Sequence, residues 1–493
     1  MDVGNTGGHK QSLQTILFRR RTLESAAIAQ PKDSLRLQLS PKVRNVRGDP
    51  YSSTQPYLST ARKCIVRIAI YGGKAGKGTT AGEVDLRSAS NWGNAIFMGL
   101  ILYVAIAMAV AGTLSSTVFL GLAAAGVVRF RADVRRQLRS FPGDEHLPAV
   151  SVLKPVHGLE AQLKQNIESF FRQDYPNYEI LFAADEPDDP ALEVVREVCA
   201  RYPRIPTRIL VTGTPWPNPV VYSFQCLAEM AAHEILVTTD SDVEVDSTYL
   251  REIVPPLLDR RVGMVTCMYR GKNAAGFFSS LTALGMSVEM TAGVLVANLL
   301  EGMKFGLGPT TVVRKDVLAS IGGYTALKDY IAYDFAIGKL IAKAGYRVVL
   351  SGHIIDHVVN QKSFSRMWQN QLRWAQTTRY SRPWGHFGSG LVFAMPFGML
   401  GLVSAVLLGH WEIGAILLGL AVVNRLVEAW LVGWTVVRDP NIRRAPWLYP
   451  LRDLLGFAVW FASYLNLRYV WRDSRFELKG TRIAMRQTSS DSR

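Results

Sequence analysis

Cysteine is scarce in this sequence. Only four occur among 493 residues, and none has the spacing of a metal-binding or redox pair: Cys64, Cys199, Cys226 and Cys267. This argues against a zinc module or a disulfide-stapled secreted fold, and it favours a reducing, cytosolic setting for the central part of the chain. An apolar run is also missing after the early arginines, so we do not expect a secretory signal there.

Residues 1–92 lack the hydrophobic periodicity of helices or strands. They are rich in Gly, Ser, Thr, Lys and Arg and carry roughly +9 of the net charge of +16. This composition predicts a mostly disordered, basic extension. Aromatic residues are sparsely interleaved with the basic ones, so nucleic acid is not an expected partner. Gly72–Thr79 is similar to a phosphate-binding loop, but Gly78 stands where the magnesium-binding Ser or Thr belongs.

A long apolar stretch follows the basic extension. Residues 94–128 contain no charged side chain, and about 20 such residues suffice to span a bilayer. Gly112 and the Ser115-Ser116 pair mark a position where the segment could bend or divide. Five arginines come directly after it, and positive charge favours the cytoplasmic side. We therefore predict a transmembrane segment over residues 93–129, with its carboxyl end facing the cytoplasm.

The C-terminal part of the chain is predicted to return to the membrane. Residues 390–409 and 413–436 are two further apolar segments, joined by a short connector without Lys or Arg. Residues 454–467 are too short for an ordinary crossing and have arginines on both sides, which favours a re-entrant or interfacial helix. The prediction is a membrane region over 387–470 and a polar tail over 471–493.

An ionisable pair interrupts the second of these apolar segments. Arg425 and Glu428 lie three residues apart, on one face of the predicted helix. Charged side chains inside a membrane segment are costly and are functional candidates by default. The alternative is an ion pair that serves packing only, and the sequence leaves both interpretations open.

Residues 130–386 have a different pattern, in which short apolar runs alternate with amphipathic stretches. Alternating strands and helices predict an α/β fold with a largely parallel sheet. The predicted strands are 149–154, 178–183, 207–211, 234–239, 263–268 and 347–350, and the clearest helices between them are 160–172, 191–201 and 247–258.

Two carboxylates stand at the end of one predicted strand. Asp240-Ser241-Asp242 follows the apolar run 234–239, and ligands of open α/β sheets gather at the carboxyl ends of strands. Mg²⁺ and Mn²⁺ prefer oxygen ligands and bridge phosphates, so a divalent cation is the expected cofactor. An isolated Asp-x-Asp can also be an ordinary turn. The neighbouring strand ends favour a site, since Lys154-Pro155 closes the first strand where a nucleotide could lie.

Several motifs appear in a fixed order around this site. They include LKPVHGLE at 153–160, QDYPNYEIL at 173–181, DDPA at 188–191, RKDVL at 314–318, Asp334-Phe335 and LRW at 372–374. This series closely resembles the ceramide glucosyltransferase family, which is related to the processive synthases of cellulose and hyaluronan. Bacterial hopanoid glycosyltransferases are similar in layout. The resemblance implies a GT-A nucleotide-sugar transferase domain with flanking transmembrane helices, and an inverting transfer from a UDP-sugar to a lipid hydroxyl.

The resemblance also implies roles for individual residues. Asp189 is similar to the family's first aspartate, at the nucleotide, and Asp240 to the second, at the metal and diphosphate. Asp242 completes the Asp-x-Asp, and Asp334 is similar to the third aspartate, the general base. Arg373 and Trp374 match the end of the Q/R-x-x-R-W motif. General chemistry agrees, because a lipid hydroxyl needs a base and a diphosphate leaving group needs positive charge.

Structural alternatives remain for three of these residues. Asp189 precedes Pro190 and could simply cap the helix that follows. Arg373 could be a surface charge on its helix and Trp374 a packing aromatic.

The chain also departs from the family pattern at three positions. Val220 follows Asn218-Pro219 where a lysine is usual, Tyr333 precedes the base where a carboxylate is common, and Asn370 replaces Gln or Arg. Each change removes charge or a longer polar arm, which could mean an altered donor or a catalytically weakened membrane scaffold.

The sequence therefore predicts an integral membrane enzyme of the bacterial inner membrane with a cytoplasmic catalytic domain. Its expected partners are a UDP-sugar donor, a membrane lipid acceptor and the bilayer itself. A ceramide-like lipid is the first acceptor and a hopanoid the second, with glucose as the expected sugar. A processive polysaccharide synthase is disfavoured, because two or three C-terminal segments are too few to build a channel.

Overall fold

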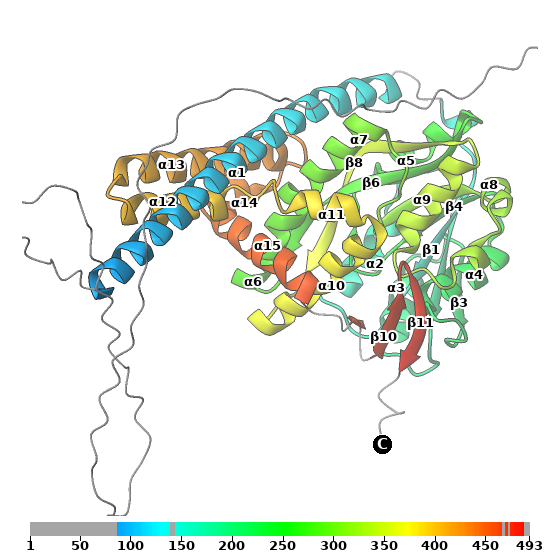
Figure 1. Ribbon diagram of the computed structural model, residues 1–493. Helices are drawn as coiled ribbons and strands as arrows, with labels where there is room; N and C mark the ends of the chain where they lie inside the picture. The colour runs from blue at the N-terminus through cyan, green and yellow to red at the C-terminus, as the bar shows by residue number, and fades with distance from the viewer. Residues whose placement is uncertain (1–85, 139–142, 466–468, 472–473, 488–493) are drawn as a thin grey trace, which may run out of the picture. The chain divides into compact units, whose positions relative to one another are not determined.

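The computed structural model describes residues 86–138, 143–465, 469–471 and 474–487. The predicted basic extension lies almost entirely outside these residues. The described part contains one large sheet, a set of long helices beside it and a small C-terminal sheet (Figure 1).

The large sheet has eight strands in the order β3-β2-β1-β4-β7-β6-β8-β5. Six strands run in one direction, while β7 and β5 are antiparallel to their neighbours. The strands are β1 (Val150–Pro155), β2 (Tyr178–Ala184), β3 (Thr207–Val211), β4 (Ile235–Thr239), β5 (Val243–Glu244), β6 (Val262–Asn273), β7 (Thr310–Arg314) and β8 (Arg347–Val359).

Alternate residues of the central strands enter two different cores. Val150 and Val152 of β1 pack with α2 (Leu163–Phe170), α3 (Ala191–Arg201) and α5 (Tyr249–Ile253). Leu153 points to the other face. That face is covered by α4 (Pro219–Met230), α8 (Lys315–Ser320), α9 (Tyr333–Lys343) and α7 (Thr291–Glu301). Strands buried on both faces explain the nearly continuous apolar runs in the sequence.

All six predicted strands are present, and β6 and β8 extend beyond their predicted ends. The predicted helix 247–258 is divided into α5 and a 3₁₀ turn at Pro255–Leu258, because Pro255 cannot continue the backbone ladder of an α-helix. Strand β7 was not predicted. The α/β fold class is confirmed, with a mixed sheet.

The first apolar stretch forms part of α1 (Leu86–Leu138), one continuous helix that passes through Gly112 without a break. Its later residues Ala123, Val127 and Phe130 are buried in the same core as Leu153 of β1, so the helix is joined to the domain of the large sheet by packing. Earlier turns contact α12 (Met395–Leu407) and α13 (Trp411–Glu428), as Figure 1 shows.

Three helices of the described chain are long and apolar enough to cross a membrane: Asn94–Leu138, Phe277–Glu301 and Trp411–Trp434. The second was not predicted. It consists of α6 (Phe277–Leu284), the π-helical turn η3 (Gly285–Met290) and α7, and most of it is buried within the protein. The short helix α15 (Leu448–Leu465) covers most of the segment predicted to be re-entrant or interfacial.

Arg425 lies at the centre of a buried ionic cluster. Its Nη1 is 2.9 Å from Glu428 Oε2 and 3.0 Å from Asp453 Oδ1, and all three side chains are at most 2% exposed. Asp453 Oδ2 in turn accepts hydrogen bonds from the backbone N–H groups of Ala394 and Met395. The cluster therefore ties α13 and α15 to the start of α12, which supports the packing interpretation of the Arg425–Glu428 pair.

Arg425→Met is expected to lower the free energy of unfolding by about 3–5 kcal/mol, because two buried carboxylates lose their counter-charge. Thermal unfolding of the purified protein in detergent would measure the change. The matched control is Arg172→Met, which removes an exposed arginine paired with Glu168 and should cost less than about 1 kcal/mol. Equal stability of Arg425→Met and the control would contradict the packing interpretation.

Strands β9 (Tyr469–Trp471), β10 (Ser474–Lys479) and β11 (Arg482–Gln487) form an antiparallel sheet. Strands β10 and β11 lie in the segment predicted to be a polar tail, and β9 lies where the predicted membrane region meets it. Gly480 closes the β10–β11 turn with φ of +63°, a conformation that favours glycine. We call strands β10 and β11 with their turn the C-terminal hairpin.

Candidate active site

Asp240 and Lys154 lie together at the carboxyl ends of two paired strands, β4 and β1. The Lys154 Nζ donates a 2.6 Å hydrogen bond to the Asp240 backbone carbonyl and lies 4.0 Å from the centre of the Phe170 ring. Lys154 is fully buried and Pro155 is partly exposed beside it. These contacts confirm that the two strand ends share one edge, as the sequence predicted.

His357 joins Asp242 at the same edge. Its Nε2 is 3.1 Å from Asp242 Oδ2, and the Val358 N–H donates a 2.8 Å hydrogen bond to the Asp242 carbonyl. His357 was missed because β8 was predicted to end at Leu350, whereas it continues to Val359 in register with β6 and β5. The sequence did contain one signal of the longer strand: His353, Ile355 and His357 recur at every second position, as residues on one face of a strand do.

Two buried polar atoms at this contact have no hydrogen-bond partner within the described chain. They are Asp242 Oδ1 and His357 Nδ1. Buried polar atoms are normally paired, so unpaired ones point to a missing ligand or ion. Carboxylate oxygens and an imidazole nitrogen also suit Mn²⁺, and the carboxylates suit Mg²⁺. These residue types therefore suit a divalent cation, although within the described residues no group of three His, Cys, Asp or Glu side chains is placed to hold one.

Asp334 approaches Asp240 across a glycine. A side-chain carbon built on Gly308 would lie 3.2 Å from Asp334 Oδ2 and 3.9 Å from Asp240 Oδ2, so both carboxylates border one small space. The Gly306 N–H donates a 3.0 Å hydrogen bond to the Asp334 carbonyl and holds this glycine segment against the start of α9. Any larger residue at position 308 would occupy the space between the two carboxylates.

The electrostatics of the site favour a cationic ligand. Burial, followed by the nearby Asp242 charge, raises the pKa of Asp240 to about 7. Burial lowers the pKa of the Lys154 ammonium to about 7, although the same aspartates oppose the change. Burial also raises the pKa of Asp334, although backbone hydrogen bonds from Phe335 and Gly308 act in the opposite direction and lower it. Three carboxyl groups thus compete for little positive charge.

The Asp242–His357 contact behaves as an ion pair. Burial opposes the charge of Asp242, but His357 outweighs it and lowers the pKa of this carboxyl. Burial likewise opposes the imidazolium of His357, and Asp242 outweighs it, so the pKa of His357 is raised. The Asp242 side chain is nevertheless 32% exposed, so solvent reaches this carboxylate.

Asp189 is held by backbone groups. Its Oδ1 accepts hydrogen bonds of 2.9 Å from the Gly158 N–H and 2.8 Å from the Ala191 N–H, and its side chain is 6% exposed. His157 Nδ1 lies 3.4 Å from Asp189 Oδ2. The carboxylate therefore joins the loop after β1 to the start of α3, which supports the capping interpretation. The predicted contact of Asp189 with the nucleotide stays a proposal.

Asp189→Ala is expected to cost about 1–2 kcal/mol of stability, because two backbone N–H groups lose their acceptor. Asp189→Asn keeps one acceptor oxygen and should be milder. Thermal unfolding without donor, followed by UDP titration, separates structural from binding effects. If Asp189→Asn left stability intact and abolished UDP binding, the carboxylate would be a direct nucleotide contact instead of a cap.

Arg373 and Trp374 lie on α10 (Phe364–Ser381). Trp374 packs near Met286 of η3 and Val359 at the end of β8, two residues beyond His357. The Arg373 guanidinium lies 5.7 Å from the Trp374 ring centre, and no hydrogen bond or ion pair joins it to the three aspartates within the described chain. Helix α10 thus lies beside the site. The predicted action of Arg373 on the diphosphate stays a proposal.

Of the three family departures, the structure explains one, Tyr333, and it shows a local role for Asn218, which precedes Pro219-Val220. Asn218 Nδ2 donates a 2.8 Å hydrogen bond to the Tyr330 carbonyl, and its Oδ1 caps α4 at Val221. Tyr333 packs 5.7 Å from the Phe224 ring and is partly buried. Burial, and then the neighbouring Asp240 and Asp334, raise the pKa of Tyr333, so its phenol stays neutral. Val220 and Asn370 have no such explanation.

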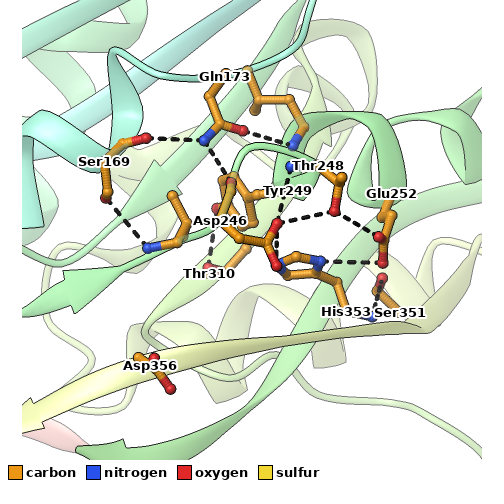
Figure 2. Close-up of polar contacts among 12 residues, drawn as sticks. Ser169, Gln173, Asp246, Thr248, Tyr249, Glu252, Thr310, Ser351, His353 and Asp356 are labelled. Atoms are coloured by element: carbon orange, nitrogen blue, oxygen red, sulfur yellow. Dashed lines mark hydrogen bonds and ion pairs between the residues drawn. The ribbon is translucent and has the colours of Figure 1, made fainter.

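A second polar cluster lies nearer the start of β8, at His353 (Figure 2). His353 Nδ1 is 3.1 Å from Glu252 Oε2, and Thr248 bridges Glu252 and Asp246. A cavity of about 380 Å³ adjoins this cluster, between the end of α1 and β8. None of the residues that line the cavity belongs to the predicted site.

The family comparison agrees with this architecture. Residues 105–484 match the model of glycosyl transferase family 21, and the chain belongs to that family. Ceramide glucosyltransferase 3 of Caenorhabditis elegans is 24% identical over 350 residues, covering 68% of this chain and 74% of that protein. Ceramide glucosyltransferase 1 of the same organism is 27% identical over 229 residues, 46% of this chain and 49% of that protein.

Solved structures resemble the chain more distantly. A Pyrobaculum calidifontis mannosyltransferase in complex with GDP-Man and Mn²⁺ has 17% identity and a TM-score of 0.46, covering 71% of this chain and 99% of that chain. The family resemblance predicted from the motifs is confirmed, and the protein is a glycosyltransferase with helices able to cross a membrane.

Proposed function

We propose that this enzyme transfers glucose from a UDP-sugar to the hydroxyl of a ceramide-like membrane lipid, with inversion and with the aid of a divalent cation. The observation that carries the proposal is the approach of Asp240 and Asp334 to the same space beside Gly308. It supports one carboxylate on the donor side and one on the acceptor side of a reacting sugar. The names of the Caenorhabditis relatives support the choice of lipid.

The donor side is formed by Lys154, Asp240, Asp242 and His357. Asp240 and Asp242 would hold Mg²⁺ or Mn²⁺, which would neutralise charge on the diphosphate, and His357 would fix Asp242 through their 3.1 Å contact. Lys154 fixes the backbone of Asp240 through its 2.6 Å hydrogen bond and adds positive charge behind the carboxylates. Arg373 is proposed to stabilise the negative charge of the leaving diphosphate. Trp374 packs against Val359 and so holds α10 beside β8.

The acceptor side is formed by Asp334. A lipid hydroxyl is a weak nucleophile, and a positioned carboxylate accepts its proton as the bond to the sugar forms. Burial raises the pKa of Asp334, which makes this carboxylate a stronger base than an exposed one. A single displacement with one base needs no covalent intermediate and inverts the anomeric centre.

A lipid acceptor suits the position of the helix Phe277–Glu301. Ser287 in η3 accepts a 3.1 Å hydrogen bond from the Gly271 N–H, and Gly271 is paired with His357 between β6 and β8. An apolar helix of spanning length thus packs directly on the strands that carry the site. We propose that the lipid hydroxyl reaches Asp334 from this side.

The arginines after the apolar part of α1 support a cytoplasmic catalytic domain. Arg129 and Arg131 donate hydrogen bonds to the Leu299 and Thr435 carbonyls, so this end of the helix is fixed to the rest of the protein. We propose a bacterial inner membrane as the location.

The test is transfer by the purified protein in lipid nanodiscs. UDP-glucose, UDP-galactose and UDP-N-acetylglucosamine are offered with ceramide or a hopanoid alcohol, and products are identified by mass spectrometry and NMR. We expect a β-glucosyl ceramide, formed with Mg²⁺ or Mn²⁺ and not with EDTA. Transfer to the hopanoid alcohol instead of ceramide would identify a hopanoid as the acceptor. If the protein neither transferred the sugar nor hydrolysed the donor, the result would indicate the catalytically weakened scaffold. Lipid extracts of deletion and wild-type cells would verify the acceptor in vivo.

A further inference from the structure

The segment that leads into Asp334 is held from one side by α4. The Asn218 N–H donates a 3.2 Å hydrogen bond to the Lys328 carbonyl, and its side-chain amide donates a 2.8 Å hydrogen bond to the Tyr330 carbonyl. The side chain of Asn218 is fully buried. One edge of this segment is therefore fixed within the catalytic domain itself.

The C-terminal hairpin holds the same segment from another side. The Ile483 N–H donates a 2.7 Å hydrogen bond to the Asp329 carbonyl, and the Ile331 N–H donates a 3.4 Å hydrogen bond to the Thr481 carbonyl. Tyr330 pairs with Arg482 as an isolated antiparallel bridge. The hairpin thus adds its β11 strand to the backbone that ends at Asp334, although the two lie about 150 residues apart in sequence.

Packing strengthens this contact. Ile331, Ala332, Phe476 and Ile483 form a small core in which each is at most 9% exposed, and Phe335 packs against it. This core occupies the residues immediately before and after Tyr333-Asp334. This small core is separate from the two large cores on the two faces of the eight-stranded sheet.

The same contacts reach the glycine segment beside the site. The Phe335 ring stacks on Phe305 with centres 5.9 Å apart and an interplanar angle of 19°. Phe305 precedes Gly306, whose N–H binds the Asp334 carbonyl. Asp334 therefore lies between a hairpin-packed residue and the glycine segment that faces Asp240.

We propose that the C-terminal hairpin is a positioning element for Asp334, with Ile483 and Phe476 as its positioning residues. The inference rests on the proposed role of Asp334. Because the hairpin follows α15 in the chain, it also links the acceptor side of the site to the C-terminal membrane region. A displacement of about 1 Å of a reacting group lowers rate by as much as about a hundredfold, so loosening this core should slow transfer.

The donor side has its own supports. Lys154, Asp189 and His357 are fixed by β1, the start of α3 and β8, and the hydrogen bonds and ion pair that hold them there involve no residue of the C-terminal hairpin. Loss of hairpin packing should therefore lower kcat and leave donor binding unchanged. A general loss of folding would change both.

The test compares Ile483→Ala and Phe476→Ala in the full-length protein. We expect kcat, normalised to folded protein, to fall about tenfold or more, with the donor KM and UDP affinity unchanged. Ile483→Val keeps most of the side chain and should retain near wild-type kcat. Phe476→Ala provides an independent measurement if Ile483→Ala accumulates poorly.

Two controls separate positioning from stability. Arg482→Ala removes an exposed contact on the same hairpin, with the Tyr330 ring, and should have little effect on kcat. Val198→Ala removes apolar volume from the core around α3, and should lower thermal stability without lowering kcat per folded molecule.

Normal kcat in both Ile483→Ala and Phe476→Ala, alongside an inactive Asp334→Asn, would overturn the inference and leave the proposed function intact. An equal loss of donor affinity and kcat would overturn it too, because it would indicate general unfolding. Full turnover by Asp334→Asn would refute the proposed base, and with it the positioning role.

Discussion

Asp334→Asn is expected to bind the UDP-sugar with wild-type affinity and to transfer it about two to four orders of magnitude more slowly. An amide has nearly the shape of the carboxylate, but it cannot accept the proton of the lipid hydroxyl. The backbone hydrogen bond from the Gly306 N–H uses the Asp334 carbonyl and survives the change. The loss should therefore fall on the chemical step.

Donor affinity and turnover must be measured on the same preparation. UDP-sugar binding by calorimetry and single-turnover transfer to ceramide in nanodiscs provide the two quantities. Tyr333→Phe is the matched control, because it changes the neighbouring residue and keeps its packing against Phe224. Wild-type turnover in Asp334→Asn would eliminate this residue as the base.

Tyr333→Glu tests whether the natural residue is a weakened variant. The glutamate would restore the carboxylate that relatives commonly have before the base. It would also place a charge beside Asp334 and Asp240 in a partly buried position, which is costly without a counter-charge. Faster transfer in this variant would mark Tyr333 as a weakening substitution, and slower transfer would mark it as adapted to its surroundings.

The sequence predicted the starts of all six strands and the ends of β1 to β4 to within one residue, because hydrophobic runs and strand-helix alternation are local signals. Asp240 and Lys154 could be placed together for this reason, since parallel strands end at one edge. His357 could not be placed in this way. The polar residues Ser351, Gly352 and His353 suggested a strand end, whereas pairing with β6 and β5 extends the strand past them.

Tertiary pairing also explains the other omissions. Strand β7 begins with Thr310 and Thr311, and it is stabilised by its place between β4 and β6. The C-terminal hairpin is short and polar, and its buried side is completed by Ile331 and Ala332. The helix Phe277–Glu301 has a mean hydropathy of 1.5, against 2.4 for Asn94–Leu138, and therefore gave a weaker membrane signal.

The roles of helix residues are the hardest to derive. The Q/R-x-x-R-W resemblance located Arg373 and Trp374, but a motif does not determine where a long side chain points. The structure packs Trp374 near Val359 and stacks Arg373 near Trp374, without a bond to an aspartate in the described chain.

Asp240→Asn should abolish the metal dependence of UDP binding. Wild-type protein is expected to bind UDP more tightly with Mn²⁺ than with EDTA, and the mutant should bind it equally weakly in both. Asp246→Asn is the matched control, since Asp246 is an exposed aspartate of the second cluster, outside the site (Figure 2). Retention of both UDP affinity and metal dependence in Asp240→Asn would contradict the metal assignment.

The pH dependence offers a second test of the same residue. Because burial and Asp242 raise the pKa of Asp240 to about 7, the metal-free carboxyl is partly protonated near neutral pH. A cation requires the ionised form, so binding must release a proton and the Mn²⁺-dependent part of UDP affinity should rise as pH increases from about 6 to about 8. The effect has this sign because the pKa is raised; a carboxyl with an ordinary pKa would already be ionised across that range. Asp240→Asn removes the titrating group, so the rise of the Mn²⁺-dependent UDP affinity with pH should disappear in this variant. An unchanged rise with pH in Asp240→Asn would assign the released proton to another residue.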